Sequence, residues 1–80
     1  MGYNEILKEV NDIFIDNLDN EKIVLKDDTT AGDIEEWDSL NHLQLVVAIE
    51  KRFKVKFTAK DIQGFKNVGD MITRIASYQK

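Results

Sequence analysis

Apolar residues recur at helical spacing in several stretches of the chain. Over residues 3–18 they follow the i, i+3, i+4, i+7 pattern of an amphipathic helix, at Tyr3, Ile6, Leu7, Val10, Ile13, Phe14 and Leu18. Similar patterns predict helices over about 39–53 and 68–78, and a short helix that begins after Thr58. The sequence therefore predicts an all-α bundle of four helices, with a short third helix and a long first loop.

Short sequence signals mark the starts of the last two helices. Thr58 precedes Asp61 by three residues, and Asn67 precedes Asp70 by three, which is the spacing of a capping box. The inward-facing positions expected in these helices are Ile62, Phe65, Val68, Met71, Ile72 and Ile75. Residues 53–57 alternate in the manner of a strand. Because no second strand is present to pair with them, we interpret them as an extended connector.

The connection between the first two helices, residues 19–38, lacks helical periodicity. It is rich in Asp and Thr and contains Gly32. The residues expected to pin this loop to the core are Ile23, Leu25, Ile34 and Trp37. We interpret Trp37 as a loop anchor rather than as a ring that stacks on a ligand. Connections of this length are uncommon in small domains and are more often functional.

The helix predicted over 39–53 is apolar on two opposite sides. At about 100° per residue, one side gathers Leu45, Val46, Ile49 and Phe53. The opposite side gathers Leu40, Leu43 and Val47, which we call the outer stripe. A helix that is apolar nearly all round is either buried on both sides or presents one side to a partner. Because 80 residues supply too little protein to bury both sides, the outer stripe is predicted to be a docking surface.

The junction between the loop and this helix carries a serine. Asp38 is a good N-cap, because its carboxylate can accept a hydrogen bond from the free N–H groups that open a helix. Ser39 then occupies the first helical position. The N–H groups and the dipole at this end of a helix favour negative charge, so a phosphate ester on Ser39 would be stabilised.

These residues resemble a known family. The run Asp38-Ser39-Leu40 at a helix start, followed by Leu43, Leu45, Val46, Ile49, Glu50 and Phe53, is similar to the acyl carrier protein family over essentially the whole chain. The resemblance implies the four-helix fold of that family and a 4'-phosphopantetheine arm, derived from coenzyme A, on Ser39. Asp38 and Leu40 would flank the attachment site. The arm's thiol would hold an acyl group as a thioester, and the protein itself would not be an enzyme.

The resemblance also implies which proteins this chain meets. They are a phosphopantetheinyl transferase (holo-acyl-carrier-protein synthase) and enzymes that load and transfer acyl groups. The partner-binding residues implied or expected are Leu40, Leu43, Val47, Glu36 and Glu50. Carriers of fatty acid synthesis usually have Gly-Ala before the motif and an acid after it, whereas this chain has Glu36-Trp37 and Asn41. We therefore expect a stand-alone carrier in a fatty-acid, polyketide or other specialised pathway.

Length, composition and charge limit the number of domains, the expected location of the protein and the kind of partner it can bind. The 80 residues fit one small domain, residues 1–80, and there is no cysteine for disulfides or thiolate metal sites. The first residues lack a targeting or lipidation signal, so we expect a cytoplasmic monomer without membrane insertion.

Residues 1–40 hold twelve acids and three bases, whereas residues 41–80 hold three acids and eight bases. The acidic Ser39 end disfavours nucleic acid and favours a basic protein partner.

The same residues could in principle serve a hydrolase or a calcium site. His42 is three residues beyond Ser39, but hydrolysis also needs a group that orients the base and an oxyanion hole. His42 is instead expected to pack against the loop or the first helix. A calcium loop that starts at Asp27 would put Ala31, which has no side-chain oxygen, at a ligand position.

Two further alternatives stay open. Loose association of divalent ions is expected with the carboxylates of Asp33, Glu35, Glu36 and Asp38. The alternative of a different class is a small helical adaptor that binds partners without being modified. Intact mass after incubation with a transferase and coenzyme A separates the adaptor from the carrier.

Overall fold

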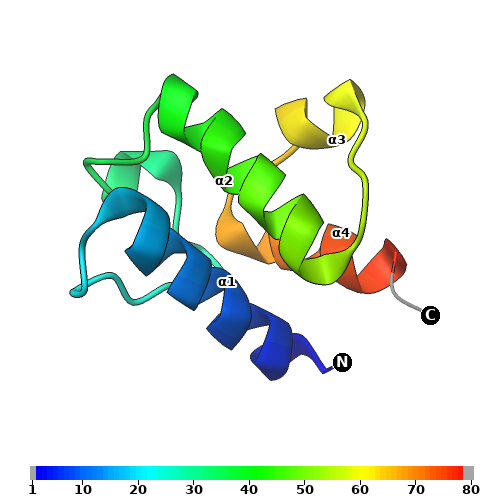
Figure 1. The fold of residues 1–80 in the computed structure, drawn as a ribbon, viewed down its shortest axis with the longest axis horizontal. Coiled ribbons are helices and arrows are strands. Elements are labelled where there is room, and N and C mark those ends of the chain that lie inside the picture. Colours follow the sequence, from blue (N-terminus) through cyan, green and yellow to red (C-terminus); the bar gives the residue numbers. More distant parts are fainter. Residues whose placement is uncertain (1, 79–80) are drawn as a thin grey trace.

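The computed structural model describes residues 2–78. The predicted domain also includes Met1, Gln79 and Lys80, which lie outside the described residues. Within the described range the elements are α1 (Tyr3–Leu18), the short 3-10 helix η1 (Ala31–Asp33), α2 (Ser39–Phe53), α3 (Ala59–Gln63) and α4 (Val68–Tyr78) (Figure 1). The all-α prediction is confirmed, as are the bounds predicted for the three longer helices.

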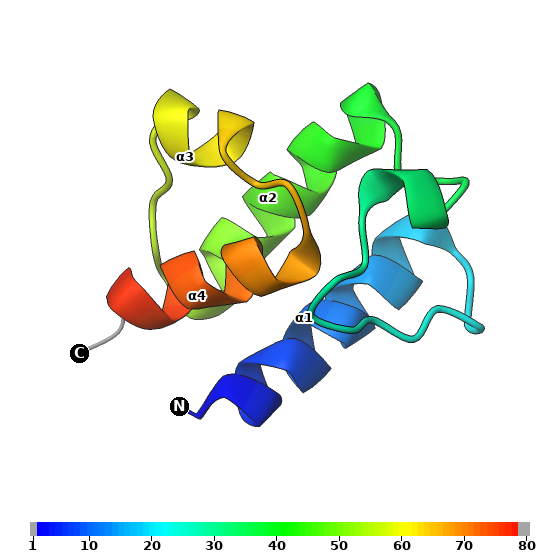
Figure 2. The same ribbon diagram turned by 180° about the vertical axis from the view of Figure 1, so that it is seen from behind.

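The core lies where α1 packs against α2 and α4 (Figures 1 and 2). Its helical residues are Ile6, Val10, Ile13, Phe14, Leu18, Leu45, Val46, Ile49, Phe53, Val68, Met71, Ile72 and Ile75, all buried. Ile62 and Phe65 pack against this cluster and are partly buried. Tyr3 departs from the predicted apolar face, because it is 38% exposed and its hydroxyl donates a hydrogen bond to Asp27 on the loop.

The carboxyl end of α2 is closed by its own side chains and backbone. Lys54 takes a left-handed conformation with φ of 56° and donates its N–H to the carbonyl oxygen of Glu50. The N–H of Val55 donates to the same oxygen. The carboxylate of Glu50 then accepts the N–H of Phe57 at 2.7 Å. These contacts turn the chain into an extended connector, as predicted, and bring it to the start of α3.

The long loop is fixed at several points along its length. Asn11 of α1 donates its side-chain amide to the carbonyl of Ile23 and accepts the N–H of Leu25. Farther along, the carbonyl oxygens of Asp27 and Thr29 accept the first N–H groups of α4, those of Gly69 (2.8 Å) and Val68 (2.9 Å).

Gly69 is required for this close approach. A Cβ at that position would lie 2.9 Å from the carbonyl oxygen of Asp27, inside normal contact distance. The loop is thus tied to both α1 and α4, and Figure 2 shows it crossing the back of the molecule between them.

Candidate functional site

Ser39 is the first residue of α2, and its position is set by the N-cap. The Oδ1 atom of Asp38 accepts the N–H of Asn41 at 2.8 Å, and the Asp38 carbonyl accepts the N–H of His42. Asp38 therefore caps the helix as predicted. Ser39 is exposed, and within residues 2–78 its hydroxyl makes no hydrogen bond. The hydroxyl is thus accessible from solvent.

Trp37 anchors the end of the loop in the core. Its side chain is 4% exposed and meets the ring of Phe14 edge to face, with centroids 4.9 Å apart. Its indole Nε1–H donates to Nδ1 of His42 at 3.0 Å, and the two rings stack. The predicted anchor role is confirmed, and so is the expected contact of His42 with the loop. Nδ1 of His42 accepts the Trp37 N–H, so it does not donate to an orienting carboxylate within residues 2–78, as the Nδ1 of a hydrolytic base does.

A second hydrogen bond holds the same corner, and no sequence pattern predicted it. The side-chain amide of Asn41 donates to the backbone carbonyl of Glu36 at 2.7 Å. The carboxylate of Glu36 in turn accepts the side-chain amide of Asn20. This contact requires a side-chain N–H at position 41, which an ionised Asp or Glu there could not supply.

A cleft opens beside Ser39. It has a volume of about 630 Å³ and is lined by Ala31, Trp37, Asp38, Ser39, His42, Leu43, Ile62, Gln63, Phe65 and Lys66. The ring of Phe65 meets that of His42 near a right angle. The cleft thus places an apolar wall next to the serine, with Lys66 as the cationic side chain in its lining.

The outer stripe lies at the surface. Leu40, Leu43 and Val47 are 67%, 55% and 47% exposed, whereas the opposite side of α2 is buried. The stripe forms a shallow groove of about 460 Å³ together with Asn17, Gln44, Ala48 and Lys51. The sequence prediction of an exposed apolar side on α2 is therefore confirmed. Its role as a docking surface stays a prediction.

The acidic residues of the site have structural contacts of their own. Asp33 closes a turn by accepting the N–H of Thr30, and Asp38 caps α2. Glu36 and Glu50 are half-buried and accept hydrogen bonds from Asn20 and Phe57. In the described part of the chain no three His, Asp or Glu side chains are grouped closely enough to hold a metal ion. The loose association of divalent ions expected with the four loop carboxylates stays a prediction.

Comparison with known proteins places this geometry in a family. A family model described as "Phosphopantetheine attachment site" matches residues 6–75, which include Ser39, the cleft and the outer stripe. The chain belongs to the acyl carrier protein family. The carrier is 29% identical over 80 residues to the acyl carrier protein of Chloroherpeton thalassium, covering 100% of both chains. It is 30% identical over 71 residues to that of Clostridium perfringens, covering 88% of this chain and 92% of the relative.

A solved structure supports the same assignment. The solution structure of a holo acyl carrier protein from Geobacter metallireducens is 38% identical and superposes with a TM-score of 0.86, covering 91% of this carrier and 84% of that chain. The protein is accordingly a carrier and not an enzyme, and its cofactor is covalently attached 4'-phosphopantetheine. A carrier of this family interacts with a phosphopantetheinyl transferase and with acyl-handling enzymes.

None of the helices in residues 2–78 combines the length and the apolar character needed to cross a membrane.

Proposed function

We propose that Ser39 carries the 4'-phosphopantetheine arm and that the arm's thiol holds an acyl group as a thioester. The observation that supports this most is the exposed, unbonded hydroxyl of Ser39 at the start of α2, beside an apolar cleft and inside the matched region. Because the carboxylate of Asp38 caps α2, the Ser39 hydroxyl is not needed as the capping group of this helix.

The residues around Ser39 suit the group that would be attached. Attachment joins the serine oxygen to the phosphorus that bears pantetheine in coenzyme A, breaks the phosphoanhydride and releases adenosine 3',5'-bisphosphate. The serine proton passes to a base on the transferase. The phosphodiester keeps one negative charge, which the amino end of α2 stabilises through its dipole. Asp38 and Leu40 flank the attachment point, and Lys66 adds a cation to the adjoining cleft.

The acidic end and the outer stripe would receive partner enzymes. Leu40, Leu43 and Val47 offer apolar surface, and Glu36 and Glu50 add negative charge next to it. The hydrogen bonds of Glu36 and Glu50 each use one carboxylate oxygen, which leaves the other available. We place this carrier in the cytoplasm as a monomer. We assign it to a fatty-acid, polyketide or other specialised pathway rather than to general fatty acid synthesis, because Trp37 and Asn41 replace the residues usual in carriers of the general pathway.

Serine replacement tests the attachment site. The chain contains only two serines, Ser39 and Ser77, and Ser77 on α4 donates its hydroxyl to the carbonyl of Arg74. After incubation with a phosphopantetheinyl transferase and coenzyme A, the wild type and Ser77→Ala should each gain the mass of one arm. Ser39→Ala should gain none, while its helical circular dichroism stays unchanged because Asp38 still caps α2. Arm mass on Ser39→Ala would refute the site, and no arm on the wild type would favour an unmodified adaptor.

A further inference from the structure

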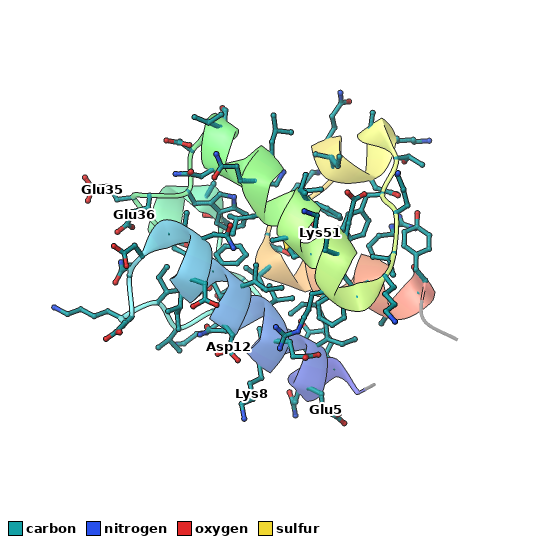
Figure 3. The ribbon with its side chains drawn as sticks, in the orientation of Figure 1. Glu5, Lys8, Asp12, Glu35, Glu36 and Lys51 are labelled. Carbon is teal, nitrogen blue, oxygen red and sulfur yellow. The ribbon has the colours of Figure 1, made fainter. Side chains whose placement is uncertain are left out.

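The groove on the outer stripe ends in a single cation. Leu40, Leu43, Val47 and Lys51 follow one another at spacings of three and four residues, so they lie on one side of α2. Lys51 therefore continues the outer stripe and is part of the groove lining. Figure 3 shows its side chain on the face of α2 turned to the viewer, with Glu35 and Glu36 near the opposite end of the helix.

The charged residues on either side of Lys51 make contacts elsewhere in the fold, and neither is paired with Lys51. Arg52 forms an ion pair with Glu9 of α1, with 3.1 Å between Nη2 and Oε1. Glu50 accepts the N–H of Phe57. Within residues 2–78 the ion pairs are Arg52 with Glu9 and Arg74 with Asp61, so Lys51 has no carboxylate partner in this range. Lys51 thus offers a positive charge that takes part in no ion pair within the described residues, at one end of an apolar groove.

The position of Lys51 falls within the reach of an enzyme that acts on Ser39. Lys51 is twelve positions after Ser39 on α2, which at about 1.5 Å per residue places them roughly 18 Å apart along the helix axis. A protein interface of ordinary size covers about 800 Å² on each partner. An enzyme that receives the Ser39 hydroxyl in its active site and lies along α2 would cover the groove and reach its cationic end.

From this arrangement the geometry points to a specific partner surface, and the inference rests on the proposed function of Ser39. The phosphopantetheinyl transferase that modifies this carrier inserts an apolar side chain into the groove and places an Asp or Glu carboxylate opposite Lys51. At the Ser39 end the transferase faces Glu35, Glu36 and Asp38, so its surface there is basic. Its docking face therefore changes sign along α2, from basic at Ser39 to acidic at Lys51.

Charge replacement at Lys51 tests this surface through kcat/KM for arm attachment by the transferase of the source organism. Lys51→Glu should lower kcat/KM about tenfold or more, chiefly by raising KM, because two like charges would then face each other. Added salt should reduce the difference. Lys51→Arg should stay close to the wild type. Lys8→Glu is the matched control, since Lys8 is exposed on α1 and the change alters the net charge equally (Figure 3).

Zero-length carbodiimide crosslinking locates the opposing carboxylate. The reagent activates a carboxylate, the neutral amine attacks it to form an amide, and the reagent leaves as a urea. The amine of Lys51, once deprotonated, should therefore couple to an Asp or Glu of the transferase. Lys51→Arg should abolish that crosslinked peptide while keeping the rate of arm attachment. Circular dichroism of each variant checks that the fold is intact. If the wild type is loaded and Lys51→Glu is loaded equally well, the inference is wrong while the proposed function stands. If the wild type is not loaded at all, the proposed function fails first.

Discussion

Trp37 shows how one residue can fix the loop that leads to the serine. Its ring packs against Phe14 in the core, and its N–H finds an acceptor in His42 on the first turn of α2. A buried indole N–H without an acceptor would be costly. The Trp-Asp-Ser order therefore joins an anchor, a cap and an exposed hydroxyl in three consecutive residues.

Substitutions at Trp37 and His42 should separate the contribution of ring packing to stability from that of the hydrogen bond between the two side chains. Trp37→Phe keeps an aromatic ring but loses the donor, which should lower the free energy of unfolding by about 0.5–1.5 kcal/mol in addition to the cost of the smaller ring. His42→Ala leaves the buried Trp37 N–H without its acceptor and should cost about 1–3 kcal/mol.

Denaturant titrations of the two single variants and the double variant measure the coupling between them. We expect the double variant to lose less than the sum of the single losses, because the second change removes a group that is already unpaired. Strict additivity would show that the hydrogen bond does not contribute to stability.

For individual residues, some contacts could be predicted from the sequence and others could not. The Asp38 cap and the anchor role of Trp37 were predictable, because capping depends on adjacent residues and a lone tryptophan in a polar loop needs burial. The bonds of Trp37 to His42 and of Asn41 to Glu36 depend on side-chain rotamers across a turn. A one-dimensional pattern does not encode those rotamers.

Among the helices, α2 has two apolar sides, of which one is buried and the other is exposed. Ile49 and Phe53 are buried in the core cluster, whereas Leu43 and Val47 are about half exposed. Ile49→Ala and Phe53→Ala should each lower the free energy of unfolding by about 2–5 kcal/mol, because they remove buried apolar groups and leave a cavity. Leu43→Ala and Val47→Ala should each cost less than about 1 kcal/mol. Denaturant titration gives all four values.

The same four variants also separate stability from docking. Leu43→Ala and Val47→Ala should reduce kcat/KM with the transferase, although their stability stays near that of the wild type. Equal stability losses on both sides of α2 would mean that the outer stripe is buried in solution, and the docking proposal would then fail.

Helices were easier to predict than the loop between them. The bounds of α1, α2 and α4 follow from apolar spacing and from capping residues, which are local signals. The loop depends on contacts distant in sequence, such as that of Asn11 with Ile23 and that of Asp27 with Gly69. One signal was available, since Asn11 follows Leu7 by four residues and precedes Phe14 by three, a polar residue on an apolar face.

For the molecule as a whole, α3 and α4 are linked by a small polar cluster that responds to pH. The hydroxyl of Tyr78 donates to Asp61, which also pairs with Arg74 at 3.3 Å. The hydrogen bond from Tyr78, followed by that from the Thr58 backbone, lowers the pKa of Asp61. The hydrogen bond to Asp61 raises the pKa of Tyr78. The cluster therefore favours the fold when Asp61 is ionised and Tyr78 is neutral.

Removal of the Tyr78 hydroxyl should show the corresponding pH window. The stability from Asp61 is complete above its unfolded pKa of about 3.9 and is lost as the pH falls through its lowered folded pKa. The stability from Tyr78 is complete below about 10 and is lost as the pH rises through its raised folded pKa. The difference in unfolding free energy between wild type and Tyr78→Phe should thus be largest near neutral pH and shrink at both extremes. A constant difference across pH, or an equal loss in Ser77→Ala, would contradict this.

The position of Trp37 also determines how the whole carrier can be observed. It is the only tryptophan in the chain, it is buried, and it lies two residues before Ser39. Its ring touches both the core and the cleft. Excitation near 295 nm selects tryptophan, as a matter of general spectroscopy, so the fluorescence of the native protein comes from this junction alone. The carrier thus contains its own optical probe at the place where arm, cargo and partner are expected to meet, and no dye has to be attached to it.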